Sequence, residues 1–155
     1  MIPRIDATAL IDPGHPGHDA ARSDARIGAM QTGFLTVHNT PISPDRIAAV
    51  IESYRAFFRL PAARKAAFDM SKTGSNRGWG APGSEQVDPD ANPDYKQVFD
   101  CGLELDPGDP VAALGLPSYA PNVWPDEPAG FSELLRSYYK HANDFALDLL
   151  CAIAD

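Results

Sequence analysis

Proline and glycine are concentrated in one stretch of the chain, and this constrains the fold more than any other feature. Nine of the 15 prolines and seven of the 12 glycines lie between Gly74 and Pro128. Proline interrupts helices and interior strands, and glycine weakens both. The flanking segments are richer in Ala, Leu, Ile and aromatic residues. The sequence therefore predicts a helical first half, a turn-rich middle and a helical tail.

Length and charge narrow the class of protein. A chain of 155 residues fits one domain. Lys and Arg total 13 against 21 Asp and Glu, giving a net charge of −8. This balance argues against a nucleic-acid partner and against an anionic membrane surface. No signal peptide and no membrane-spanning run is recognisable. We expect a soluble cytoplasmic protein with reduced thiols.

Two helices have the clearest signals. Ser43 is a good N-cap residue, and Pro44 suits the first helical position because its missing N–H costs nothing there. One apolar face follows, made of Ile47, Val50, Ile51, Tyr54, Phe57 and Phe58. The last helix begins near Ser132, and its apolar stripe still runs at Ile153. No capping signal follows, which favours a chain cut short.

Shorter elements are expected around these helices. Residues 2–5 and 34–38 are typical of strands, the second one buried. A helix is expected over 20–32, with Gly33 as its left-handed cap residue. Further elements are a short helix over 62–68 and a strand within 95–105.

A histidine pair is the only metal-ligand pattern in the sequence. His15, His18 and Asp19 form an H-x-x-H-D cluster with ligand types suited to zinc or iron. The cluster lies in a Pro/Gly loop rather than on one helical face, so a solvated polar loop is the favoured interpretation. Metal binding there is the weaker alternative. His38 is expected to make a structural hydrogen bond, and His141 to lie on the surface.

Nucleophilic and nucleotide-binding motifs are missing from the sequence. There is no G-x-S-x-G elbow and no P-loop. Two cysteines are too few for a disulfide scaffold. Cys101 has no base near it in sequence and is interpreted as a packed small residue. Cys151 is expected to be buried in the last helix.

The segment Asn76-Arg77-Gly78-Trp79-Gly80 offers the best candidate for ligand contact. An arginine between flexible residues, beside an aromatic ring, can hold a carboxylate in a bidentate fork. Glycines let the backbone approach a ligand closely. The competing interpretation is a surface arginine with Trp79 packed in the core.

Seven short motifs in a fixed order carry a family resemblance. They are Ile2-Pro3-x-Ile5-Asp6, Gly33-Phe34-Leu35-Thr36-Val37-x-Asn39, Phe57-Phe58-x-Leu60-Pro61 with Lys65, Arg77-Gly78-Trp79, Asp94-x-Lys96-Gln97, Asn122-x-Trp124-Pro125 and the aromatic helix from Phe131 to Ile153. Together they resemble the N-terminal region of the isopenicillin N synthase-like family of non-haem Fe(II) oxygenases, most of which use 2-oxoglutarate. The resemblance covers nearly the whole chain.

The resemblance implies an α+β fold and an incomplete enzyme. Residues 1–130 would form a helical non-haem dioxygenase N-terminal domain with a few strands. Residues 131–155 would begin the long helix leading to a double-stranded β-helix (jelly-roll) catalytic domain, most of which this chain lacks. Such enzymes hold iron with two histidines and one carboxylate. No histidine here is followed two residues later by Asp. The chain is therefore expected to contain no catalytic residue and no metal ligand, and to be inactive alone.

The resemblance also assigns roles to individual residues. Arg77 and Trp79 match a stretch that faces the substrate in some relatives, so both are substrate-binding candidates. Lys96 is expected in a structural ion pair. The Asn122-x-Trp124-Pro125 turn is expected to be structural, with Trp124 packed and Asn122 capping the bend. One departure is Asn39-Thr40-Pro41 where the family usually has Asn-His-Gly, so this turn should be built differently.

Two hypotheses follow for the function. The first is the N-terminal part of an Fe(II) oxygenase, with 2-oxoglutarate as the expected co-substrate, that hydroxylates, desaturates or cyclises a small organic substrate. Its partner would be the missing jelly-roll domain. The second is a non-catalytic interaction module derived from that family.

Overall fold

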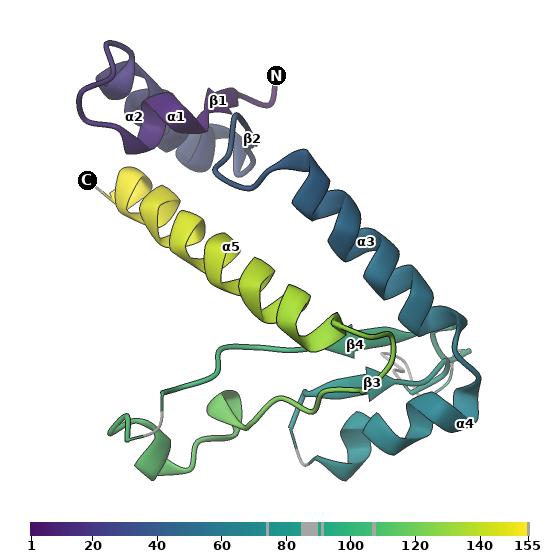
Figure 1. The fold of residues 1–155 in the computed structure, drawn as a ribbon. Coiled ribbons are helices and arrows are strands. Elements are labelled where there is room, and N and C mark those ends of the chain that lie inside the picture. The colour runs from purple at the N-terminus through teal and green to yellow at the C-terminus, as the bar shows by residue number, and fades with distance from the viewer. Residues whose placement is uncertain (74, 85–89, 91, 107, 155) are drawn as a thin grey trace. The chain divides into compact units, whose positions relative to one another are not determined.

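The computed structural model describes residues 1–73, 75–84, 90, 92–106 and 108–154 (Figure 1). They form two compact units, one of Met1–Ala48 with Ser137–Asp155 and one of Ala49–Arg136. The division falls inside helix α3 (Pro44–Arg59) and inside helix α5 (Phe131–Ala154). Described helices greatly outweigh described strands, which confirms the predicted α+β class with few strands. No helix in the described ranges is long and apolar enough to cross a membrane.

The first unit is a small crossover structure. Strand β1 (Arg4–Asp6) pairs in parallel with β2 (Thr36–His38). The connection holds α1 (Ala7–Ile11), α2 (His18–Ile27) and the π-helical turn η1 (Gly28–Thr32). The last turns of α5 lie beside α1 and α2 (Figure 1). The buried core is made of Ile5, Ala9, Leu10, Ala21, Ala25 and Ala152.

Asp6 ties the end of β1 to the turn after β2. One oxygen of its carboxylate accepts from the backbone N–H of Thr8 at 3.0 Å and so caps α1. The other accepts from the side-chain amide of Asn39 at 3.1 Å. This hydrogen bond from Asn39 is the main cause of the lowered pKa of Asp6. Asn39 takes a left-handed φ of 53°. In the turn before Pro41, the positive φ is thus taken by Asn39. That this turn differs from the turn of relatives stays a prediction.

The second unit packs the end of α3 and the start of α5 around a two-stranded sheet. Strands β3 (Gly78–Gly80) and β4 (Val98–Asp100) are antiparallel. Helix α4 (Ala62–Lys65) and the 3-10 turns η2 (Ala66–Phe68) and η3 (Met70–Lys72) precede β3. The turns η4 (Ala112–Leu114) and η5 (Pro117–Tyr119) follow β4. The buried core is made of Phe57, Trp79, Phe99, Phe131 and Leu135.

Aromatic rings join the two helices of this unit to its sheet. Phe57 stacks on Phe131 with ring centroids 5.3 Å apart. It also meets Phe99 of β4 edge-on at 4.9 Å. Such geometries are favourable beyond the area that they bury. The ring cluster therefore fixes α3, α5 and β4 within the unit.

Lys65 is a buried cation that is held without an acidic partner in the described residues. Lys65 is only 5% exposed to solvent. The ammonium donates to the carbonyl of Phe58 at 2.7 Å and to the side-chain oxygen of Gln97 at 2.9 Å. It also lies 5.4 Å from the ring centroid of Trp79. Burial lowers the pKa of Lys65. These contacts link the last turn of α3 to the segment before β4.

The structure confirms the helices that were predicted from their capping residues. Ser43 accepts from the backbone N–H of Arg46 at 3.3 Å, as expected of an N-cap. The final helix begins at Phe131, close to the predicted start. Gly33 has the expected left-handed φ of 71°. The helix expected over 20–32 begins at His18 and becomes π-helical from Gly28.

Other predictions were wrong in detail. The strand expected over 34–38 covers only Thr36–His38, and Phe34 is 69% exposed because it precedes the pairing with β1. The strand expected within 95–105 is limited to Val98–Asp100, since its partner β3 has only three residues. Helix α1 was missed. Cys151 is exposed rather than buried, because its neighbour Ala152 is the residue that turns into the core.

Candidate functional site

Arg77 lies at one end of the β3–β4 sheet in the second unit. Gly78 pairs with Asp100 in the antiparallel register, so Arg77 lies opposite Cys101 just beyond the ladder. Gly78 has a φ of +106°, and a Cβ there would lie 2.3 Å from the carbonyl oxygen of Phe68. Only glycine allows this approach. Gly78 was expected to let the backbone approach a ligand, and in the structure it is required by the close contact with the carbonyl of Phe68.

The guanidinium of Arg77 is fixed by neutral acceptors. Nη2 donates to the carbonyl of Ser118 at 2.8 Å, and Nη1 donates to the carbonyl of Asn76 at 3.3 Å. Nε is buried and has no hydrogen-bond partner among the residues that the structure describes. No carboxylate in the described part of the chain lies within 4.0 Å of this guanidinium. A buried donor left unpaired costs about 1–3 kcal/mol, and more when charged. The side chain is therefore held in place with part of its hydrogen-bonding capacity unused.

Gly102 forms the floor under this guanidinium. A Cβ at Gly102 would lie 2.2 Å from Nη2 of Arg77 and 2.3 Å from Cζ. Asn122 holds the backbone of Gly102 with two hydrogen bonds of 2.8 Å, one to its N–H and one to its C=O. Asn122 was expected to cap its own bend, and its side chain instead bonds the backbone of Gly102 in another segment. The guanidinium of Arg77 therefore packs directly against the backbone of Gly102. Nothing in the sequence predicts this contact.

An open pocket of about 420 Å³ borders Arg77. None of the described side chains that line it is acidic. They provide one guanidinium, one amide and two hydroxyls, and they are Ser75, Asn76, Arg77, Pro117 and Ser118. The electrostatic character of this pocket is therefore set by one cation among neutral polar groups.

Trp79 lies in the core and does not line that pocket. It is 4% exposed and belongs to the buried aromatic cluster of the second unit. Its indole N–H donates to the side-chain oxygen of Gln97 at 3.1 Å, the same oxygen that binds Lys65. The two residues that the sequence grouped as substrate-binding candidates thus have different surroundings.

A second arginine in this unit is fully engaged. Arg136 donates to both carboxylate oxygens of Glu104, at 2.7 and 3.2 Å. Trp124 donates to the same carboxylate at 2.9 Å, and its ring lies 5.1 Å from the Arg136 guanidinium. Burial acts to raise the pKa of Glu104, but the hydrogen bonds from Arg136 and Trp124 lower it below its usual value. The packing role predicted for Trp124 is confirmed.

Cys101 is half-buried and packs against the aromatic cluster, as predicted. Burial raises the pKa of its thiol, although the nearby Arg77 charge and a hydrogen bond with Tyr54 act the other way. A raised pKa keeps the thiol protonated and weakly nucleophilic. Cys101 therefore contributes packing beside Arg77.

The histidine pair in the first unit makes local backbone contacts. His15 accepts from the N–H of Gly17 at 3.0 Å through Nδ1. Nδ1 of His18 lies 3.0 Å from the carbonyl of Ala9, to which it donates. Within the described ranges no three His, Cys, Asp or Glu side chains cluster as metal ligands would. The metal alternative for His15, His18 and Asp19 therefore has no geometric support.

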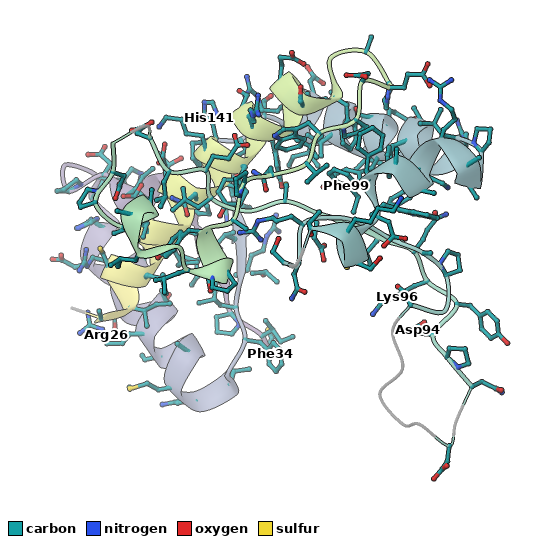
Figure 2. The ribbon with its side chains drawn as sticks, turned by 90° about the horizontal axis from the view of Figure 1, so that it is seen from below. Arg26, Phe34, Asp94, Lys96, Phe99 and His141 are labelled. Carbon is teal, nitrogen blue, oxygen red and sulfur yellow. The ribbon has the colours of Figure 1, made fainter. Side chains whose placement is uncertain are left out.

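Two further predicted contacts concern surface residues. Nζ of Lys96 lies 3.3 Å from Asp94, confirming the ion pair, and Figure 2 shows the two side chains together on the segment before β4. Both residues are about half exposed, so the pair contributes little stability. His141 is exposed, as predicted, and lies 2.6 Å from the carbonyl of Ser137.

Comparison with known protein families identifies the chain. The family model described as "non-haem dioxygenase in morphine synthesis N-terminal" matches residues 2–127. The chain belongs to this family. Among curated proteins, the chain is similar to a homoarginine-6-hydroxylase of Arabidopsis thaliana, 34% identical over 79% of this chain and 36% of that protein. A 2-oxoglutarate-dependent dioxygenase of Phoma sp is 30% identical over 88% of this chain and 45% of that protein.

Solved structures agree with this family assignment. A putative 2OG-Fe(II) oxygenase family protein of Caulobacter crescentus matches with a TM-score of 0.81 at 25% identity, over 99% of this chain and 47% of that one. A full-length Neurospora crassa protein in complex with alpha-KG matches with a TM-score of 0.78 at 28% identity, over 99% of this chain and 46% of that one. The chain thus spans half or less of the length of these relatives.

Proposed function

We propose that this chain is the N-terminal part of a non-haem Fe(II), 2-oxoglutarate-dependent oxygenase that acts on a small organic substrate. The observation that carries the proposal is the family match over residues 2–127. The structural match over 99% of the chain to 2OG-Fe(II) oxygenases supports it. The proposed reaction is hydroxylation, desaturation or ring closure in the cytoplasm.

Iron does not fit the residues of this chain that the structure describes. A facial triad needs two histidines and a carboxylate close together, and the described residues hold no such cluster. In the proposal, iron and 2-oxoglutarate are held by a jelly-roll catalytic domain outside this sequence, where they supply the oxidising chemistry. Residues 1–130 form the N-terminal domain, and residues 131–155 begin the helix that leads on.

The proposed role of this chain is to bind and orient the substrate. Arg77 is the residue that we assign to substrate contact, because its guanidinium borders an open pocket and donates to backbone carbonyls rather than to a carboxylate of the described residues. Trp79 supports it from the core, where its ring and indole N–H fix the backbone next to Gly78. Relatives named homoarginine-6-hydroxylase, and the Neurospora crassa protein in complex with alpha-KG and thymine, support a small polar substrate.

Oxygen consumption tests this proposal. The gene product that contains this chain, expressed at its native length, should consume O₂ and form succinate when Fe(II), 2-oxoglutarate and a substrate are present. The 155-residue chain should do neither. Turnover by the 155-residue chain alone would refute the proposal. A native gene product that ends at Asp155 and folds stably without turnover would favour the alternative, a non-catalytic interaction module.

A further inference from the structure

Asn122 closes a long loop at its base. Its side-chain amide accepts from the backbone N–H of Gly102 and donates to the backbone C=O of the same residue, and both hydrogen bonds are 2.8 Å long. An amide side chain carries both a donor and an acceptor, so one Asn can satisfy both backbone groups of one residue. The two residues are 20 positions apart, and the chain between them forms a loop, 103–121. One side chain therefore fixes both ends of this loop.

A second anchor ties the same loop to helix α5. Trp124 donates to the carboxylate of Glu104 at 2.9 Å, and Arg136 of α5 donates to that carboxylate at 2.7 and 3.2 Å. These contacts do not use the backbone of Gly102. Loss of the hydrogen bonds between Asn122 and Gly102 should therefore leave the loop attached to the second unit.

Two residues that Asn122 holds in place fix the guanidinium of Arg77. Nη2 of Arg77 donates to the carbonyl of Ser118, within the loop, at 2.8 Å. The guanidinium also packs against the backbone of Gly102, where a Cβ would lie 2.2 Å from Nη2 and 2.3 Å from Cζ. Arg77 itself lies outside the loop, just before β3. The position of its guanidinium therefore depends on how the loop is closed.

The same loop lines the pocket that borders Arg77. Pro117 and Ser118 belong to the described lining of this pocket of about 420 Å³. Asn122 is not among the described residues that line it. An effect of Asn122 on a ligand in this pocket must therefore pass through the loop and through Arg77.

We propose that Asn122 is a positioning residue of the substrate pocket, because it holds Gly102 and Ser118 where they fix the guanidinium of Arg77. This inference rests on the proposed function, in which Arg77 contacts the substrate, and adds a residue 45 positions further along the chain. A side chain that is already fixed loses less conformational entropy when a ligand binds. Asn122 thus lowers the entropic cost of substrate binding without touching the substrate.

The Nε–H resonance of Arg77 in the ¹⁵N-labelled native-length gene product reports the position of the guanidinium. Nε is buried, so exchange of its proton with water requires the side chain to move out. We expect Asn122→Ala to speed this exchange about tenfold or more, because the buried group is released. The indole N–H resonance of Trp79 should stay in place, which reports that the core of the unit is intact.

Trp124→Phe is the matched control. It removes the hydrogen bond to Glu104 and keeps an aromatic ring, so it loosens the other anchor of the same loop. We expect the Nε–H of Arg77 to remain protected in this variant. Equal acceleration in Asn122→Ala and Trp124→Phe would indicate a general loosening of the loop and would overturn the inference.

Two further variants test the direction of the effect. Arg77→Met should preserve slow exchange of the side-chain amide protons of Asn122, because the hydrogen bonds to Gly102 do not involve Arg77. Fast exchange of these protons would mean that Arg77 holds the loop, which contradicts the inference. Gly102→Ala keeps the backbone groups that Asn122 binds but displaces the guanidinium, so it should accelerate exchange at Arg77 even where Asn122→Ala does not fold.

These readouts separate the inference from the proposed function, since none of them depends on turnover. An Nε–H of Arg77 that stays protected in Asn122→Ala or in Gly102→Ala would overturn the inference even where the native-length product forms succinate. Faster exchange in both variants, with no succinate formed by wild type, would uphold the positioning of Arg77 and reject the proposed function alone.

Discussion

The guanidinium of Arg77 occupies the space that a Cβ at Gly102 would fill, with Nη2 only 2.2 Å from that position. The two residues are 25 positions apart in the sequence and meet because β3 and β4 pair antiparallel. This contact explains why a cation with an unpaired, buried Nε stays in one place. It also provides a way to move the cation without removing it.

Gly102→Ala should cost the fold little. The clashing atoms are the far end of a flexible side chain, so Arg77 can swing away, and we expect a loss of less than about 1 kcal/mol in the free energy of unfolding. Urea unfolding followed by tryptophan fluorescence measures this loss. A loss of several kcal/mol would show that the guanidinium cannot leave its position.

Gly78→Ala should be far more damaging and is the matched comparison. Its Cβ would meet a backbone oxygen, that of Phe68, at 2.3 Å, and its φ of +106° is strained for any side chain. Backbone strain and a clash that cannot relax should together cost about 2–4 kcal/mol. The same urea experiment tests this value, and equal stability of the two alanine variants would contradict the structure at β3.

Lys65→Met tests the buried ammonium. The carbonyl of Phe58 would lose its side-chain donor, while Gln97 would still accept a hydrogen bond from the indole of Trp79. We therefore expect the free energy of unfolding to fall by about 1–3 kcal/mol near neutral pH. Burial lowers the pKa of Lys65 below its usual 10.5. Between these two pKa values the unfolded chain binds more protons, so the stability contribution of Lys65 rises with pH.

Lys65→Met should therefore remove this increase in stability with rising pH. Chemical unfolding of wild type and variant at a series of alkaline pH values measures the difference. Parallel stability curves for the two proteins would show that the ammonium of Lys65 is solvated rather than buried.

Two substitutions of Asn39 separate the effect of backbone strain on stability from the effect of the hydrogen bond. Asn39→Gly keeps the left-handed φ of 53° but removes the hydrogen bond to Asp6, whereas Asn39→Ala loses both. The hydrogen bond lowers the pKa of Asp6 below 3.8, so its contribution is present above that pH and is lost as the pH falls through the lowered pKa. We expect the Asn39→Ala variant to be less stable than the Asn39→Gly variant at neutral pH. The difference in stability between Asn39→Gly and wild type should disappear at acid pH, which thermal unfolding can measure.

Local signals explain what could be predicted. Ser43 and Pro44 mark the start of α3 through capping and the fixed φ of proline, and Gly33 marks a left-handed end. These features depend on a few neighbouring residues. The order of the family motifs likewise depends only on the sequence, and the family match over residues 2–127 confirms the resemblance.

Long-range contacts explain what could not be predicted. Strand β3 consists of Gly78, Trp79 and Gly80, which have no strand pattern of their own and pair only because β4 is beside them. The surroundings of Arg77 depend on Gly102 and Ser118, which are 25 and 41 positions further along the chain. Cys151 lies on an apolar stripe wider than the buried face, as the exposed Leu147 and Leu150 show, so its exposure depends on tertiary packing.

Iron binding is the most direct test of the proposed function, because the iron ligands are proposed to lie in a domain outside this sequence. Anaerobic Fe(II) titration is measured for the 155-residue chain and for the native-length gene product that contains it, with His15→Ala/His18→Ala as the control variant. We predict stoichiometric binding by the native-length product, none by the 155-residue chain and no effect of the histidine variant. Stoichiometric Fe(II) binding by the 155-residue chain alone would contradict the account.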